Sequence, residues 1–217
     1  MKKVIWLASG LLLGAPAFAA TIYNNPYSAS ADTGNCEFSS ICGNNYADDI
    51  AAQLFTINTN VTITAGDFTE LDSLENGPPS SANWAIYTDS LGLPGAMLFS
   101  GTGAPISLVS NAGLDTSGIF YVATYTFNIP TVALTSGSYF FALQTTSSYY
   151  GNNLAEGTTD SGAAETKNGT TWAPNYEGIG GVAVELDGAF GVPEPATLGF
   201  VAVGFCMLGL MRRRKTR

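Results

Sequence analysis

The sequence predicts an all-β protein, an antiparallel β-sandwich of the jelly-roll or immunoglobulin type, enclosed by two targeting segments. Three observations predict it. Short runs of β-branched and aromatic residues recur along the chain, each bounded by Gly, Pro, Asn, Asp or Ser. Their spacing is typical of sandwiches and not of parallel sheets, and signals for helix are nearly absent between residues 20 and 191. Both ends of the chain are basic and border an apolar run.

The first targeting segment is a predicted signal peptide over residues 1–19. Two lysines follow the initiator methionine, and residues 4–15 are almost wholly apolar. Ala17 and Ala19 supply the small residues that precede a signal peptidase cut. We therefore expect signal peptidase to act on the chain and the mature protein to begin at Ala20.

The region from residue 20 to residue 190 has a length that suits one extracytoplasmic domain with a hydrophobic core. Residues 44–54 are the only stretch in it that would allow a short helix or turn. The strands are predicted from alternating or continuous apolar runs. They cover residues 54–57, 61–64, 84–88, 97–100, 106–109, 119–129, 139–145 and 182–186.

Two strands carry finer predictions. Trp84 lies inside a strand and is expected in the core. Tyr139 begins a strand just after a Gly turn, a pattern typical of the corner tyrosine whose hydroxyl bonds nearby backbone, although a plain strand aromatic remains the alternative. In the run at 119–129 one face is mainly apolar, and we predict that it is buried. That face consists of Ile119, Tyr121, Ala123, Tyr125, Phe127 and Ile129.

The charge of the domain excludes several functions. Lys167 is its only basic residue against sixteen Asp and Glu, which gives a net charge of about −15 at neutral pH. Binding of nucleic acid is not expected, because phosphate contacts need Lys and Arg. A basic patch for anionic lipid or acidic polysaccharide is absent for the same reason.

Two of the three cysteines, Cys36 and Cys42, lie close together in a segment rich in Gly and Asn. In an oxidising compartment we predict a disulfide between them, which would fasten a stretch with few apolar residues. Two free thiols or a metal pair are the alternatives. The third, Cys206, belongs to the apolar run near the C-terminus.

Carboxylates are the main catalytic resource of the chain, because it has no histidine. The densest group is Asp67, Glu70, Asp72 and Glu75. In a strand, Glu70 and Asp72 would share a face; in a loop, the group could hold calcium. Acidic residues on a solvated connector are the ordinary interpretation. We therefore predict no enzyme and no cofactor, with calcium as the one candidate and a carboxylate-dependent glycoside hydrolase as the weaker alternative.

Four aromatic residues lie in polar, Gly-rich surroundings, where they are less expected in the core: Tyr149, Tyr150, Trp172 and Tyr176. Sugar rings stack on such side chains when a rigid scaffold exposes them in loops. They are candidate glycan contacts. They could equally cover an open end of the core.

The second targeting segment is the tail at 191–217. It contains Pro193, Glu194 and Pro195, then a predicted hydrophobic helix over residues 196–211, then a basic end over residues 212–217 that includes Arg212, Arg213, Arg214 and Lys215. The apolar run is short for a permanent membrane anchor. The basic end would stay in the cytoplasm and leave the domain outside.

This tail resembles the PEP-CTERM sorting signal over residues 192–215. The resemblance implies that exosortase, a membrane-embedded processing enzyme, removes the tail, in bacteria that make extracellular polysaccharide. The predicted hairpin at 84–103 is similar to one in β-sandwich outer domains that precede such anchor tails. That second resemblance extends to residues 55–57 and 136–143 and implies a fold and a setting, without an activity.

We therefore expect an exported protein that is first anchored by its C-terminal helix and then located at the cell surface or in the extracellular matrix. The first function predicted is structural or adhesive, with exopolysaccharide or other matrix proteins as partners. The alternative is a carbohydrate-binding module that uses the four aromatic residues.

Overall fold

In the residues that it describes, the computed structural model shows an all-β domain with twelve strands in two antiparallel sheets. Within its described ranges, no helix is long and apolar enough to cross a membrane. The cysteine pair lies outside these ranges, as do the predicted signal peptide apart from Ala19 and the sorting tail apart from Gly191. The structure describes residues 19–29, 50–73, 79–115, 118, 120–146, 153–155, 157–158, 163–167, 171–174 and 181–191.

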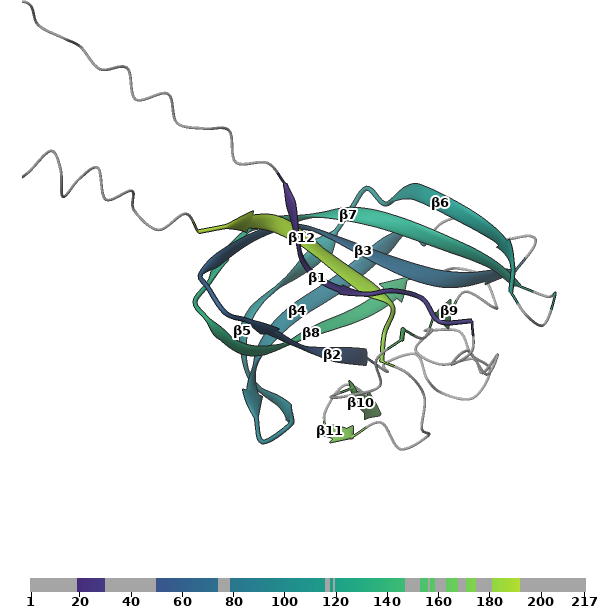
Figure 1. Cartoon of the computed structure of the whole chain (residues 1–217). Helices are drawn as coiled ribbons and strands as arrows, with labels where there is room; N and C mark the ends of the chain where they lie inside the picture. Colours follow the sequence, from purple (N-terminus) through teal and green to yellow (C-terminus); the bar gives the residue numbers. More distant parts are fainter. Residues whose placement is uncertain are drawn as a thin grey trace, which may run out of the picture.

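The first sheet, called the β3 sheet, has the strand order β1-β12-β3-β7-β6, and β9 also pairs with β3. Figure 1 shows β3, β7 and β12 side by side in this layer. The strands are β1 (Ala20–Asn25), β3 (Val61–Ser73), β6 (Ser107–Leu114), β7 (Phe120–Leu134), β9 (Asn153–Leu154) and β12 (Val184–Phe190).

The second sheet, called the β8 sheet, has the strand order β11-β10-β2-β8-β4-β5. Its far edge curls, so that β11 lies against β5 as well as beside β10. The strands are β2 (Ile50–Ile57), β4 (Ser81–Ser90), β5 (Leu93–Gly103), β8 (Gly137–Thr146), β10 (Ala163–Lys167) and β11 (Thr171–Pro174).

The main core lies between the two sheets. Phe55 and Phe141 enter it from the β8 sheet, and Phe68 and Phe127 enter it from the β3 sheet. Each such side chain contributes about 1.5–3 kcal/mol when it is fully buried. The predicted burial of one face of β7 is confirmed, because Ala123, Tyr125, Phe127 and Ile129 all belong to this core, as does Trp84.

A second, smaller apolar cluster covers the outer face of the β8 sheet. Phe140 and Ala142 point to this face, and Ala164 of β10 packs over them. Trp172 and Tyr87 lie at its margin. The β10–β11 pair therefore folds back over its own sheet and gives that sheet apolar packing on both faces.

All eight predicted strands are present and longer than predicted, although β6 and β12 begin later than predicted, at Ser107 and Val184. Two expectations are wrong in part. Residues 50–54 form the first half of β2 and are not helical, and β3 does not end at residue 64 but continues to Ser73. Four strands were not predicted: β1, β9, β10 and β11.

The corner tyrosine is confirmed. The Tyr139 hydroxyl donates a hydrogen bond of 3.0 Å to the carbonyl oxygen of Thr135, four residues earlier in the chain. This bond ties the start of β8 to the turn that leads into it.

The two ends of the domain meet at one pole of the sandwich. Ala20, the first residue of β1, pairs with Gly188 near the end of β12. The Gly191 amide then donates a 2.7 Å hydrogen bond to the carbonyl oxygen of Asn60. Figure 1 shows both strands leaving the domain on the same side. We call this side the attached pole, because the sorting tail follows Gly191.

Candidate functional site

The predicted acidic group is divided by the strand that carries it. Side chains alternate along β3, so Glu70 and Asp72 point into the sandwich with Phe68, while Asp67 points outward. Glu75 lies outside the described residues. Asp67 therefore cannot share an ion with the other two carboxyl groups.

Glu70 and Asp72 do not lie on a solvated connector, as the ordinary interpretation would have it. Their exposed fractions are 0% and 5%. That interpretation fails because the connector is a strand and its inner face is covered by the opposite sheet. The prediction that these two residues share a face is confirmed.

These buried carboxyl groups form a hydrogen-bonded cluster with β7. The Tyr125 hydroxyl donates a hydrogen bond to Oδ2 of Asp72, and Glu70 lies beside Asp72 on the same face of β3. Burial raises the pKa of Asp72, while its interactions with Tyr125 and Glu70 lower it in part.

The same cluster changes the tyrosine. Burial raises the pKa of the Tyr125 hydroxyl, and the hydrogen bond and charge of Asp72 raise it further, followed by the charge of Glu70. The hydroxyl therefore stays protonated and remains a donor. A glycoside hydrolase needs its two carboxyl groups on either side of a sugar bond. Glu70 and Asp72 instead lie together inside the core, where the hydrogen bond from Tyr125 to Asp72 links β7 to β3.

A metal centre of the usual kind is not formed by the described residues, among which no three Cys, Asp or Glu side chains are arranged to hold an ion. Calcium stays a prediction for the chain as a whole.

Of the four predicted glycan contacts, Trp172 lies in the described part of the chain. Tyr149, Tyr150 and Tyr176 lie outside it. Trp172 is half-buried and packs edge-on against Tyr87, with ring centroids 5.3 Å apart and an angle of 75° between the rings. This geometry places Trp172 in the packing of β11 over the β8 sheet.

A small groove opens on the same outer face, with a volume of about 80 Å³. Tyr87 was missed as a candidate in the sequence. The signal for it was present, because Tyr87 alternates with the core residues Trp84 and Ile86 and so had to face outward. The groove is lined by Ile50, Asn83, Trp84, Ala85, Tyr87, Ala142 and Gln144.

A larger depression, called the polar cavity, lies on the outer face of the β3 sheet and has a volume of about 300 Å³. That is the lower end of the range for small-molecule sites. The sequence does not predict this cavity, because its walls come from β1 and the residues after it, from β3, from β7 and from the chain around the start of β12. It is lined by Asn24, Asn25, Pro26, Tyr27, Asp67, Phe68, Thr69, Thr124, Ala183, Val184 and Glu185.

Carboxylates give the polar cavity its charge. Glu185 accepts hydrogen bonds from the Thr21 hydroxyl at 2.6 Å and from the Asn24 amide at 3.0 Å. Burial raises the pKa of Asp67, a bond from Thr126 lowers it, and the charge of Glu185 raises it. Oδ1 of Asp67 is buried without a hydrogen-bond partner in the described structure.

A third carboxylate stands beside these two. Burial raises the pKa of Asp187, and the charges of Glu185 and Asp67 raise it further. The outer face of the β3 sheet is therefore strongly negative. Its amide, hydroxyl and carboxylate groups suit a neutral or cationic ligand that donates hydrogen bonds, and they disfavour an anionic one.

The geometry defines a β-sandwich domain with a polar outer face and with its first and last strands meeting at one pole. A comparison with protein families indicates how the domain is sorted in the cell. Residues 191–215 match the family model of the PEP-CTERM protein-sorting motif. The chain thus carries a PEP-CTERM sorting signal, which supports export, surface association and sorting by exosortase. Neither the curated proteins nor the solved structures contain a match to the chain.

Proposed function

We propose that this chain is a structural or adhesive protein of the bacterial surface or extracellular matrix, whose tail is removed by exosortase and which associates with exopolysaccharide. The sorting motif at 191–215 carries the proposal. It begins where the last strand of the fold ends, so sorting acts on an otherwise complete domain.

The arrangement of the ends supports a display role. Only Gly191 and Val192 separate the end of β12 from Pro193, a chain distance of about 10 Å. While the tail is attached, the domain is therefore held close to the membrane by its attached pole. The opposite pole, where β3 and β8 end and β4 begins, then faces away from the membrane and is the part offered to partners.

The experiment that tests this function is mass spectrometry of the native protein from the envelope and from the medium of its own host. Glu194→Ala is expected to leave the tail on the chain and to retain the protein in the membrane fraction. Thr197→Ser, two residues after the motif, is the matched control and is expected to be processed like the wild type. Processing of both variants to the same extent would refute sorting through the motif.

A second candidate function is glycan binding, and the polar cavity favours it. Amide and hydroxyl groups of Asn24, Thr69 and Thr124 are suited to sugar hydroxyls, and Tyr27 offers a ring for stacking. Trp172 is less suited, because Tyr87 already packs against it. Tyr149, Tyr150 and Tyr176 remain candidate contacts.

This candidate is tested by titrating the protein with neutral and with anionic oligosaccharides from the host matrix. If the cavity binds sugar, Thr124→Ala weakens binding of a neutral oligosaccharide at least tenfold and Trp172→Ala leaves it within twofold. If Trp172→Ala weakens binding and Thr124→Ala does not, the binding site lies at the aromatic residues and not in the polar cavity. Binding unchanged in both variants would refute both locations.

A further inference from the structure

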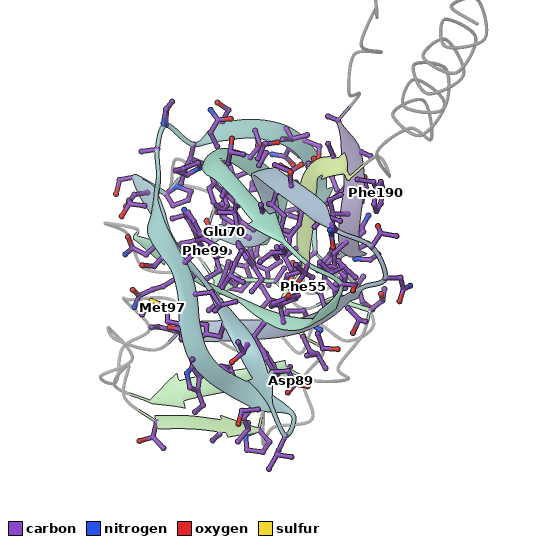
Figure 2. All side chains as sticks on the ribbon, turned by 90° about the vertical axis from the view of Figure 1, so that its left-hand side faces the viewer. Phe55, Glu70, Asp89, Met97, Phe99 and Phe190 are labelled. Carbon is purple, nitrogen blue, oxygen red and sulfur yellow. The ribbon has the colours of Figure 1, made fainter. Side chains whose placement is uncertain are left out.

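Two edge strands lie on one side of the sandwich. β5 is the last strand of the β8 sheet and β6 is the last strand of the β3 sheet. Residues 104–106 join them directly, so the two sheet edges are neighbours where the chain crosses from one layer to the other. In Figure 2, β5 runs along one margin of the molecule with Met97 beside it.

These strands carry most of the exposed apolar surface. Of the eight large apolar side chains exposed in the described part of the chain, six belong to β5 and β6, with exposed fractions of 38% to 56%. Scattered apolar side chains are normal on a surface, but a concentration on adjoining edges indicates an interaction site. The six are Met97, Leu98, Phe99, Leu108, Val109 and Leu114.

The same stretch is free of charge. Residues 90–114 contain no Asp, Glu, Lys or Arg, although the domain around them carries a net charge of about −15. Edge strands of soluble proteins are commonly protected by charged side chains that prevent pairing with another chain. We call residues 90–114 the neutral edge, because this protection is missing from it.

The backbone of β5 is suited to pairing. Residues 99–103 pair in unbroken antiparallel register with residues 82–86 of β4. In such a ladder, every second residue turns its amide and carbonyl groups away from the neighbouring strand. Over residues 99–103 these groups form a row on the side of β5 away from β4 that an added strand could use. β11 packs near the other end of β5, where Trp172 shares an apolar cluster with Leu93 and Tyr87.

We propose that the neutral edge binds the neutral edge of a second copy of this chain, with β5 against β5 in antiparallel register. The charge distribution favours this edge for contact between two copies. Two copies repel each other through faces that carry carboxylates, such as the outer face of the β3 sheet with Asp67, Glu185 and Asp187. At the neutral edge the repulsion is weakest, and apolar side chains meet apolar side chains.

A two-fold axis makes the contact self-complementary, because each copy offers the same strand to the other. The β8 sheets of the two copies then become one continuous sheet. The contact leaves the attached pole free, so it is compatible with copies that are still held by their tails and with copies already released. It does not depend on the function proposed above.

Sedimentation equilibrium of the protein purified from its host, in detergent if the tail is retained, tests the proposal. The wild type is expected to form dimers, and the dissociation constant should fall as ionic strength rises, because salt screens the like charges. Leu98→Glu is expected to raise the dissociation constant at least tenfold. Thr131→Glu adds the same charge at an exposed position of β7 and should change it less than twofold.

Cysteine cross-linking in the intact envelope gives an independent readout. Ser100→Cys lies on the exposed part of β5 and is expected to yield a disulfide-linked dimer on non-reducing gels, beyond any background from the native cysteines. Thr56→Cys, an exposed position on β2, is the control and should add none. A protein that is monomeric at all concentrations and salts, or a dimer indifferent to Leu98→Glu, overturns the proposal.

Discussion

The hydroxyl of Tyr125 on β7 donates a hydrogen bond to the carboxyl group of Asp72 on β3, inside the sandwich. The two residues belong to neighbouring strands of one sheet, and Glu70 contacts the same carboxyl group. A polar cluster of this kind contributes to stability only while its groups are satisfied and its protons are in place. The stability of the domain should therefore depend on pH and on the Tyr125 hydroxyl.

The pH dependence of stability has an unusual sign at Asp72. Its pKa in the folded state is raised above the ordinary value of 3.8, so the folded protein binds more protons than the unfolded chain in the interval between the two values. Its contribution to the free energy of unfolding is full below pH 3.8 and is lost as the pH rises through the raised pKa. Asp67 and Asp187 act in the same direction.

Asp72→Asn tests this sign, because it keeps the shape and an acceptor for Tyr125 but does not titrate. The stability of the wild type relative to Asp72→Asn is expected to decrease from pH 4 to pH 7. Urea denaturation at a series of pH values measures it. A difference between the two proteins that is constant or grows with pH would contradict the prediction.

Loss of the donor should be costly in the core. Tyr125→Phe leaves an oxygen of Asp72 without its hydrogen bond and is expected to lower the free energy of unfolding by about 2 kcal/mol. Tyr139→Phe is the comparison, because its carbonyl partner at Thr135 is exposed and water can replace the hydroxyl. That variant should cost about 1 kcal/mol or less. Equal losses of unfolding free energy in the two variants would show that burial does not make the hydrogen bond to Asp72 more costly to remove.

β12 lies so close to β3 at Gly188 that a side chain would not fit there. A Cβ atom there would lie 1.8 Å from the carbonyl oxygen of Thr62, at the irregularity where the register between the strands shifts. Gly188→Ala is expected to destabilise the domain by about 2–3 kcal/mol, because backbone has to move. Gly137→Ala is the control, since its nearest atom is in the Tyr139 ring at 3.3 Å. Thermal unfolding of both variants tests the difference.

The chain should tolerate loss of its tail but not of its last strand. A chain that ends after Gly191 keeps all twelve strands and is expected to unfold cooperatively. A chain that ends before Val184 lacks β12, which lies between β1 and β3, and is expected to show no cooperative transition. Circular dichroism during heating distinguishes the two. Cooperative unfolding of the shorter chain would mean that the β3 sheet closes without β12.

Local patterns predicted the parts of the fold that depend on local chemistry. The alternation in β7 identified its buried face, and the Gly turn before Tyr139 identified the corner bond. The same reasoning failed for Glu70 and Asp72, which were interpreted as residues of a solvated connector but are buried in the core. Acidic side chains are rare in strands, and the hydroxyl that accommodates Asp72 comes from Tyr125, far away in the sequence.

The candidate sites were harder to predict for a related reason. Trp172 has polar, Gly-rich neighbours in the sequence, which favoured exposure, but Tyr87 from a distant strand packs against it. The polar cavity takes its walls from four parts of the chain, and no one of them has a distinctive motif. Only the sorting motif is contiguous, and it was predictable from the sequence for that reason.

The pairing of Ala20 with Gly188 also sets an order of events during export. The first strand to leave the translocation channel has to remain unpaired until the last strand has followed, because its neighbour in the sheet is β12. Such a long-range closure is slow compared with local hairpins. Completion of the fold is thereby tied to the arrival of the C-terminal end at the membrane, so a chain arrested before residue 184 would expose the free edge of β3 to proteases and to aggregation.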